Sequence, residues 1–247
     1  KHLGDELDIH TGGEDNLFPH HECEIAQSEA FLGKPFARYW MHSKFLQVDG
    51  GKMSKRLGNV WNLDDVQARG YTPRQLRFAL IRGHYRGPLN FTWGILEEAK
   101  SALAKLDDLV SDVQAATRGE RVAADPRAGA EALAGARARF EEGLDDDLNV
   151  PQALAALFEL RSAFLEGGVG LATAQEALAF MRRAHEALGV LRLEEGGGAE
   201  LEALLSEYVA ARARRDWATS DRLRAAAAQK GWVIKDTPQG PAVSFRA

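Results

Sequence analysis

The sequence is poor in cysteine, with a single one among its 247 residues. One cysteine excludes an internal disulfide, and such sparing use fits a reducing cytoplasm. No apolar run approaches the roughly 20 residues that cross a bilayer, and no signal-peptide pattern opens the chain. A net charge of −5 argues against a surface that coats nucleic acid along its whole length. We therefore expect a cytoplasmic protein that is a monomer and has no membrane contact.

Residues 9–27 contain a pair of glycines, an acidic pair and several candidate metal ligands. The alternating segment 7–10 predicts a short strand, and Gly12 and Gly13 after it can adopt positive φ and bring backbone close to a ligand. A strand, a glycine turn and a helix form the nucleotide-binding corner of open α/β sheets. An ordinary turn with solvated acids is the alternative, and the glycines alone favour that alternative.

A possible metal site follows at the start of the next expected helix, near Pro19. His20, Cys23 and Glu24 fall at positions i, i+3 and i+4, so an imidazole, a thiol and a carboxylate share one helical face. Zinc suits that mixture of ligands, whereas calcium and magnesium prefer oxygen alone. His21 points elsewhere, and we expect it to support the ligands from behind or to lie at the surface. Coincidental spacing is the alternative, because two or three ligands leave a tetrahedral site incomplete.

A basic loop comes after a second expected strand at 44–48 and a turn at 49–51. Residues 52–59 read KMSKRLGN, with two lysines and a serine beside glycine. Lysines on a mobile loop can neutralise the charge that develops as pyrophosphate leaves a nucleotide, and the loop can close over it. A solvated basic loop is the alternative, but the full string after a strand is much more specific than two spaced lysines.

These segments together resemble the cysteinyl-tRNA synthetases, a family of class I aminoacyl-tRNA synthetases. KMSKR is similar to the KMSKS signature of that class, and IHTGGEDNLFPHHECEIAQSEA and YWMHSKFLQVDGGKMSKRLGN are similar to this family in particular. The resemblance resumes at 145–154, 215–217 and 236–240. It covers nearly the whole chain, as the C-terminal half of such an enzyme.

The resemblance implies a ligase that activates cysteine with ATP and magnesium and transfers it to the cysteine tRNA. It also implies a zinc ion that binds the thiolate of the substrate, and zinc prefers sulfur to a neutral hydroxyl. By position, the family's zinc ligands fall on His20 and Glu24, and its two cysteine ligands are expected upstream of Lys1. The other implied site residues are Lys52, Ser54 and Lys55 for catalysis, Gly13, Asp15 and Lys55 for ATP, and His10 as an active-site polar group, unless His10 belongs only to a strand-end polar network.

The chain departs from the family pattern in several places. The HIGH-type motif that holds ATP in class I synthetases is absent, so we expect this chain alone not to form cysteinyl-adenylate. The chain starts at Lys1, which suggests an excerpt of something longer or a paralogue without the first half. Cys23 stands where many members have asparagine, and we hypothesise that its sulfur could compete for metal. Arg56 in place of the usual final serine is a mild variation.

Helical patterns dominate the rest of the chain. Asn62 and Pro73 predict helix starts, and the second helix reads RQLRFALIRGHYR through residue 86. A stripe of apolar residues from Leu96 to Val113 at steps of three and four predicts a long helix. Further helices are expected at 127–142, 150–166 and 171–189, with core positions that include Leu154, Leu157, Phe158 and Leu165. The acidic run 141–147 is expected to be a loop and helix cap, and 117–127 and 194–199 are expected to be linkers.

The last segment is expected to be a small domain of two helices and two strands. From residue 211 to 247 eight Lys/Arg face three Asp, so the local charge is 8 − 3 = +5, which can serve a phosphate backbone. The resemblance implies that this domain reads the anticodon, through Arg212, Trp217, Asp221 and Asp236. A Trp217 buried between helices is the alternative. The family's contact with the inner side of tRNA is expected at Arg74, Arg77, Arg82, His84 and Arg86, unless these are only a solvated basic face.

The expected fold is therefore α/β followed by mostly α. Residues 1–61 form the C-terminal part of a Rossmann-like catalytic domain with the lysine loop, 62–93 a stem-contact region, 94–195 a helical bundle and 200–247 an anticodon-binding α+β domain. Two other functions stay open. One is a stand-alone, non-catalytic paralogue that binds tRNA or protein, and the other is the related ligase that joins cysteine to an amino sugar. The basic C-terminal segment argues against the amino-sugar ligase, and the intact lysine loop argues against the paralogue.

Overall fold

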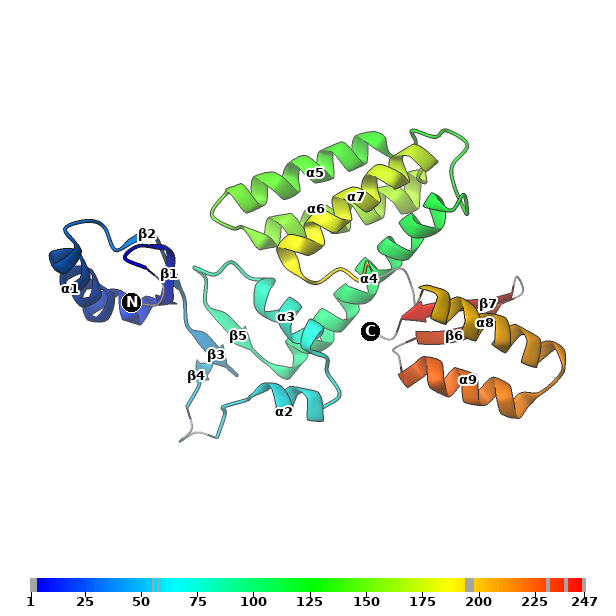
Figure 1. The fold of residues 1–247 in the computed structure, drawn as a ribbon, viewed down its shortest axis with the longest axis horizontal. Coiled ribbons are helices and arrows are strands. Elements are labelled where there is room, and N and C mark those ends of the chain that lie inside the picture. The colour runs from blue at the N-terminus through cyan, green and yellow to red at the C-terminus, as the bar shows by residue number, and fades with distance from the viewer. Residues whose placement is uncertain are drawn as a thin grey trace. The chain divides into compact units, whose positions relative to one another are not determined.

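A computed structural model describes residues 4–54, 56, 58–193, 198–229, 232–237 and 240–245 (Figure 1). Its first elements form a parallel βαβ unit, in which β1 pairs with β2. This unit confirms the expected order of strand, glycine segment and helix. The elements are β1 (Leu7–Gly13), η1 (Glu14–Asn16), η2 (Leu17–His21), α1 (Glu22–Leu32) and β2 (Ala37–Ser43).

A second small sheet carries the beginning of the lysine loop. It consists of β3 (Leu46–Val48), β4 (Gly51–Lys52) and β5 (Leu89–Phe91) in the order β4-β3-β5. β3 is antiparallel to β4 and parallel to β5. Asp49 and Gly50 join β3 to β4 with φ of 50° and 76°, which are the dihedrals of a type I′ hairpin turn. The turn expected at 49–51 is confirmed, while the strand before it is shorter than expected.

Two capped helices follow the loop. Asn62 accepts a hydrogen bond from the Asp65 amide at the start of α2 (Leu63–Ala68), and a Thr72–Gln75 capping box starts α3 (Pro73–Ile81). Both predicted starts are thus confirmed. The second helix ends five residues earlier than the pattern suggested. Gly83 is a poor helix former, and the carbonyl of Tyr85 instead accepts a bond from the Lys44 amide at 2.8 Å.

Residues on both sides of α2 form an aromatic cluster. Trp61 and Trp93 meet edge to face at 5.0 Å between ring centroids. The guanidinium carbon of Arg69 lies 3.9 Å from the centre of the Trp93 ring and 5.2 Å from that of Trp61. Such cation–π contacts anchor the chain a few residues beyond the lysine loop.

The long helices bury the stripes that the sequence predicts. In α4 (Trp93–Thr117), Leu96, Leu106 and Val113 are fully buried. Leu154 and Leu157 are also buried, but Leu165 is 59% exposed and its neighbour Phe164 takes the core position. The other helices of this region are α5 (Ala130–Asp145), α6 (Val150–Gly167) and α7 (Leu171–Leu188).

The acidic run was expected to be a loop, and this expectation is wrong for most of it. Residues 141–145 continue α5, and only the residues after Asp145 leave the helix. The reason is that Ala136, Phe140 and Gly143 are buried at a spacing of four and three residues. Their apolar face extends the helix into the acidic segment, whose carboxylates lie on the other side.

The C-terminal segment forms the two helices and two strands that were expected. α9 packs against α8 and against β6, and the strands pair antiparallel. A small core contains Tyr208, Leu223, Ala227 and Ile234. The expected turn residues Pro238 and Gln239 lie outside the described part of the chain, as do residues 194–197 of the second expected linker. The elements are α8 (Gly198–Ala213), α9 (Trp217–Gln229), β6 (Trp232–Thr237) and β7 (Gly240–Phe245).

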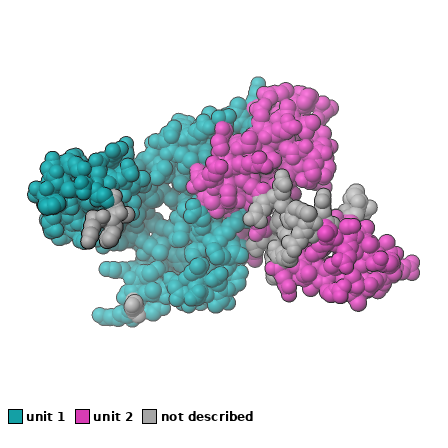
Figure 2. Space-filling view, in the orientation of Figure 1, with its two compact units in different colours: residues 1–99, 131–162 teal, residues 100–130, 163–247 magenta. Residues whose placement is uncertain are grey.

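The chain divides into two compact units (Figure 2). Unit 1 contains residues 1–99 and 131–162, and unit 2 contains residues 100–130 and 163–247. The four expected domains stay a prediction. Among the described residues, no helix combines the length and the hydrophobicity that crossing a membrane requires.

Candidate active site with a histidine cluster

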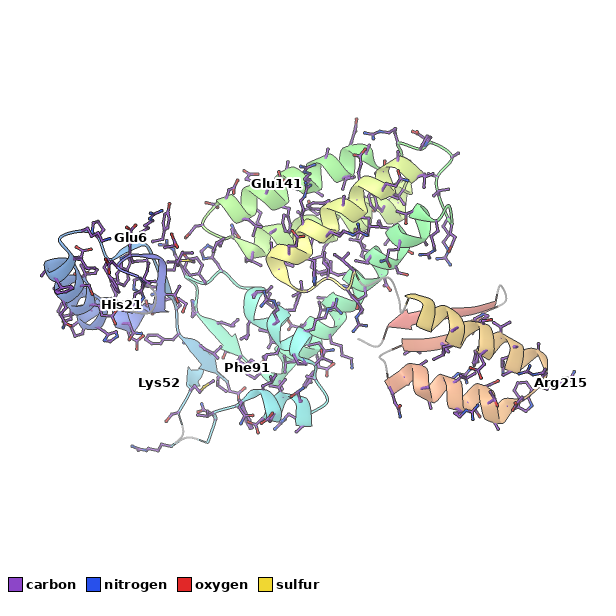
Figure 3. The ribbon with its side chains drawn as sticks, viewed as in Figure 1. Glu6, His21, Lys52, Phe91, Glu141 and Arg215 are labelled. Atoms are coloured by element: carbon purple, nitrogen blue, oxygen red, sulfur yellow. The ribbon has the colours of Figure 1, made fainter. Side chains whose placement is uncertain are left out.

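The pairing of β1 with β2 gathers aromatic and histidine side chains on one face of the sheet. His10 is opposite Trp40 and Gly12 is opposite His42 in the register of the two strands. Because side chains alternate between faces, residues two apart on each strand share a face. The chain then returns through η2 and α1, which add His21 and other polar groups. Figure 3 labels His21 in this part of the molecule.

The carboxylate of Glu24 lies between two imidazoles. Its Oε2 is 2.8 Å from Nε2 of His10, and its Oε1 is 3.2 Å from Nε2 of His20. The second distance confirms that His20 and Glu24 share a face of the chain, as their spacing predicts. The contact with His10 joins residues fourteen positions apart, and the sequence alone did not reveal it.

His21 is a central member of this cluster and not a surface residue. It is 3% exposed, and its Nδ1 lies 2.8 Å from Nε2 of His42. Burial lowers the pKa of His21, and the neighbouring His10 and His42 lower it further. The expectation of a surface position was wrong because the turn before α1 directs this side chain under the sheet. His20 takes the outer position instead, with a side chain 64% exposed.

Trp40 supplies the platform on which the imidazoles stack. Its ring is 4.5 Å from that of His10 at an interplanar angle of 16°, and it is nearly parallel to the ring of His42 at 6.4 Å. His21 leans on the same indole at 5.1 Å. The histidines are therefore held by ring packing as well as by polar contacts, which restricts their rotamers.

Gly12 and Gly13 have no side chain at points where other residues come close to the backbone. Gly13 has φ of −74°, and neither it nor Gly12 is among the described glycines with positive φ. The expectation of a positive-φ turn is therefore wrong. A Cβ on Gly12 would lie 2.6 Å from Cε1 of His21, and one on Gly13 would lie 2.5 Å from Oδ1 of Asp15. The buried His21 ring leaves no room for a side chain at Gly12, whereas the exposed Asp15 side chain near Gly13 could move aside.

Three groups of the cluster could share a metal ion. The ligand atoms of His10, His21 and Glu24 all lie within 4.8 Å of one another. Oε2 of Glu24 is buried and has no hydrogen-bond partner of good geometry, although His10 is near it. Cys23 is exposed and is not part of this group.

The candidate nucleotide residues lie on two parts of unit 1. The carboxylate of Asp15 folds back over Gly13, and Glu14 next to it forms an ion pair with Lys44. The lysine loop starts in β4 with Lys52, which Figure 3 labels at that strand. Ser54 follows with its amide bound to the Asn59 side chain, while Lys55 lies outside the described residues.

Several basic residues of the expected stem-contact region are engaged in ion pairs. Arg82 contacts Glu98 at 2.5 Å, and Arg86 contacts Asp147 at 2.6 Å. The hydroxyl of Tyr85 donates to the same Asp147 carboxylate at 2.6 Å. These bonds lower the pKa of Asp147, with the Tyr85 hydroxyl as the main cause. Asp147 could not be predicted as a partner from local patterns, because it lies about sixty positions away.

The candidate RNA-reading residues of unit 2 include an exposed aromatic ring. Trp217 is 54% exposed, so it is not buried between helices. The guanidinium carbon of Arg212 lies 4.8 Å from the centre of its ring. Asp221 is exposed on the same helix as Trp217. Asp236 belongs to β6 and its backbone pairs with Pro241, but its side chain lies outside the described part of the chain.

Comparisons with known proteins show similarity to tRNA synthetases. The model of the tRNA synthetases class I (C) catalytic domain matches residues 1–101, and the DALR domain matches residues 139–192. The cysteine–tRNA ligase of Symbiobacterium thermophilum is 41% identical over 97% of this chain and 53% of its own length. That of Protochlamydia amoebophila is 40% identical over 96% of this chain and 50% of its own length. The chain thus spans about half the length of the curated relatives it matches.

A solved structure shows a similar fold over most of the chain. The LeuRS of Agrobacterium radiobacter K84, in a ternary complex with tRNA and LeuAMS, aligns with a TM-score of 0.56 and 17% identity. The alignment covers 70% of this chain and 25% of that one. At this identity the likeness concerns the fold alone. With both domain models and relatives near 40% identity over nearly all of its residues, the chain belongs to the cysteine–tRNA ligase family of class I tRNA synthetases.

Proposed function

We propose that the complete protein carrying this chain is a cysteine–tRNA ligase. A carboxylate oxygen of cysteine attacks the α-phosphorus of ATP and pyrophosphate leaves. The terminal ribose hydroxyl of the cysteine tRNA then attacks the carbonyl carbon of the adenylate, and AMP leaves. The observation that carries this proposal is the joint presence of the His20–Glu24 pair and the KMSKR loop in a chain of this family.

We further propose that His20 and Glu24 contribute two ligands to a zinc ion. The donors fit, because an imidazole nitrogen and a carboxylate oxygen are ordinary zinc ligands and the pair is 3.2 Å apart, close to the ~3.3 Å between neighbouring ligands of a tetrahedral site. The other oxygen of this carboxylate, Oε2, is buried beside His10 without a hydrogen-bond partner of good geometry, which also suits a group that binds a cation. When bound, zinc would supply a Lewis acid that selects the cysteine thiolate over a hydroxyl.

The protein's own residues have distinct roles in this proposal. Gly13 and Asp15 contact the adenosine of ATP, bound with magnesium. Lys52, Ser54 and Lys55 stabilise the charge that develops on the departing pyrophosphate. His10, held between Trp40 and Glu24, is positioned to orient polar atoms of the substrate.

The C-terminal residues would bind tRNA. An exposed indole offers a plane for a splayed base, and the neighbouring Arg212 adds positive charge and further stacking surface. Asp221 and Asp236 can accept hydrogen bonds from base edges. Trp217→Ala should weaken binding of the cysteine tRNA about tenfold without loss of fold, as measured by filter binding and circular dichroism. Equal affinity of the variant would remove Trp217 from the interface.

Cysteine-dependent ATP–pyrophosphate exchange tests the ligase itself. We expect exchange from the complete reading frame that encodes this chain, and none from the 247-residue chain alone, because the sequence contains no HIGH-type motif. Serine in place of cysteine should give no exchange. A complete protein that binds the tRNA but never exchanges pyrophosphate would identify a non-catalytic binder instead.

A further inference from the structure

The segment 52–59 folds back on itself through one side chain, that of Asn59. Its Oδ1 accepts a hydrogen bond from the Ser54 amide at 2.7 Å, and its Nδ2 donates to the Lys52 carbonyl at 3.1 Å. One amide group thus joins two backbone groups that flank Met53. Asparagine can do this because its side chain presents a donor and an acceptor side by side.

The residue before Asn59 has a backbone conformation that favours the contacts of Asn59 with Lys52 and Ser54. Gly58 has φ of 66°, in the left-handed region that glycine adopts without penalty, and a Cβ there would meet nothing within 4 Å. The left-handed residue helps to turn the chain back beside Lys52 and Ser54. A further local bond runs from the Arg56 amide to Oγ of Ser54 at 3.3 Å.

Strand β4 reaches only the first residue of the segment, Lys52. Lys52 pairs with Gln47 in the β3–β4 hairpin, whereas Met53 and Ser54 belong to no strand or helix. Among the described residues of 52–59, the Asn59 amide is the group that links the entry of the loop to its exit. Without it the direction of Ser54, which no strand or helix holds, would depend on a short chain with large conformational freedom.

We propose that Asn59 is a positioning residue for the adenylate-forming step, and this inference rests on the proposed ligase function. Asn59 does not touch the reacting atoms. It fixes the backbone of Lys52 and Ser54, so that their side chains are directed before pyrophosphate starts to leave. Its removal should therefore slow formation of the adenylate and leave the later transfer to tRNA unchanged.

Three variants test this role in the protein made from the complete reading frame. Asn59→Ala removes both bonds. Asn59→Asp keeps the acceptor for the Ser54 amide but places an oxygen against the Lys52 carbonyl. Asn62→Ala is the matched control, because Asn62 caps α2 three residues later and its loss costs helix stability without touching the loop.

The first readout is hydrogen exchange of the Ser54 amide in the ¹⁵N-labelled protein. We expect exchange at least about tenfold faster in Asn59→Ala, and near the wild-type rate in Asn59→Asp and Asn62→Ala. Equal Ser54 protection in wild type and Asn59→Ala would overturn the inference at the structural level, whatever the activity of the protein.

The second readout separates the two chemical steps. In single-turnover experiments, adenylate formation should be about tenfold to a hundredfold slower in Asn59→Ala, with KM for cysteine within about twofold of wild type. Transfer from preformed adenylate should keep its rate, and Asn62→Ala should keep both rates. Partial recovery of the first step in Asn59→Asp would support the role of the Ser54 bond.

The outcomes distinguish this inference from the function on which it rests. A wild-type protein without cysteine-dependent exchange would refute the ligase proposal. An active wild type with an Asn59→Ala variant of equal adenylation rate would refute only the role of Asn59. Equal slowing of both steps in Asn59→Ala would show a general structural defect and would also overturn it.

Discussion

The histidine cluster and the lysine loop, both in unit 1, are built in different ways. The cluster takes its side chains from β1, η2, α1 and β2, and ring stacking on Trp40 together with close polar contacts fixes them. In the loop, Ser54 belongs to no regular element and is held by the Asn59 amide. Side chains that recognise a substrate by its shape and ligand chemistry need fixed positions, which helices and strands provide. Side chains that neutralise charge developing during a reaction can lie on a loop that moves.

Among the predictions that test this comparison, the largest expected effect is the loss of bound zinc from the cluster. Glu24→Ala in the complete protein should lower bound zinc from about one equivalent to near zero, because one carboxylate serves both imidazoles. Metal analysis by mass spectrometry measures this directly. Glu22→Ala, on the same helix and outside the group, is the control and should keep its zinc. Unchanged zinc in both Glu24→Ala and His20→Ala would exclude the proposed site.

A smaller effect is expected from the glycine under the cluster. Gly12→Ala should destabilise the fold by about 1–3 kcal/mol, because the new Cβ would overlap the His21 ring in a packed site. Urea unfolding followed by circular dichroism gives the change in free energy. Gly12→Asn should be worse still, since the larger side chain has even less room. A neutral Gly12→Ala would show that the cluster is looser than its contacts indicate.

The smallest effect is expected at the glycine of the loop. Gly58→Ala should cost roughly 1 kcal/mol, because only the positive φ is strained and the space around it is open. Asparagine tolerates this conformation better, so Gly58→Asn should recover part of the loss in the same urea experiment. Opposite responses to asparagine at positions 12 and 58 would establish that the two glycines are needed for different reasons. Similar responses would contradict the contrast between cluster and loop.

The sequence predicted those features that depend on neighbours along the chain. The spacing of His20 and Glu24 sufficed because a single helical turn brings them together, and the caps at Asn62 and Thr72 depend on residues three positions later. The helical structure of the acidic segment was not predicted, because it depends on burial of the helix face that contains Phe140. The charged residues of the segment do not by themselves show which face of the helix is buried.

Contacts that depend on strand register, or on distant segments of the chain coming together, could not be predicted from local patterns. His42 meets His21 only because β1 and β2 pair in parallel with Gly12 opposite His42. Likewise, Asp147 meets Tyr85 across about sixty residues, and no periodicity encodes such a contact. The family resemblance suggested candidate site residues, but it did not describe the bonds that hold them.

The aromatic cluster beyond the loop also provides a built-in optical probe. The indole of Trp61 stands two residues after Asn59, with the Arg69 cation 5.2 Å from its ring centre. Indole emission responds to a nearby charge, so a rearrangement at that end of the segment should change the wavelength or yield of fluorescence without any added label. Of the five tryptophans in the chain, Trp40 stacks on histidine and Trp217 is half-exposed. Replacing each by phenylalanine would assign the signals, and stopped-flow fluorescence would then test whether the segment rearranges when ATP is added.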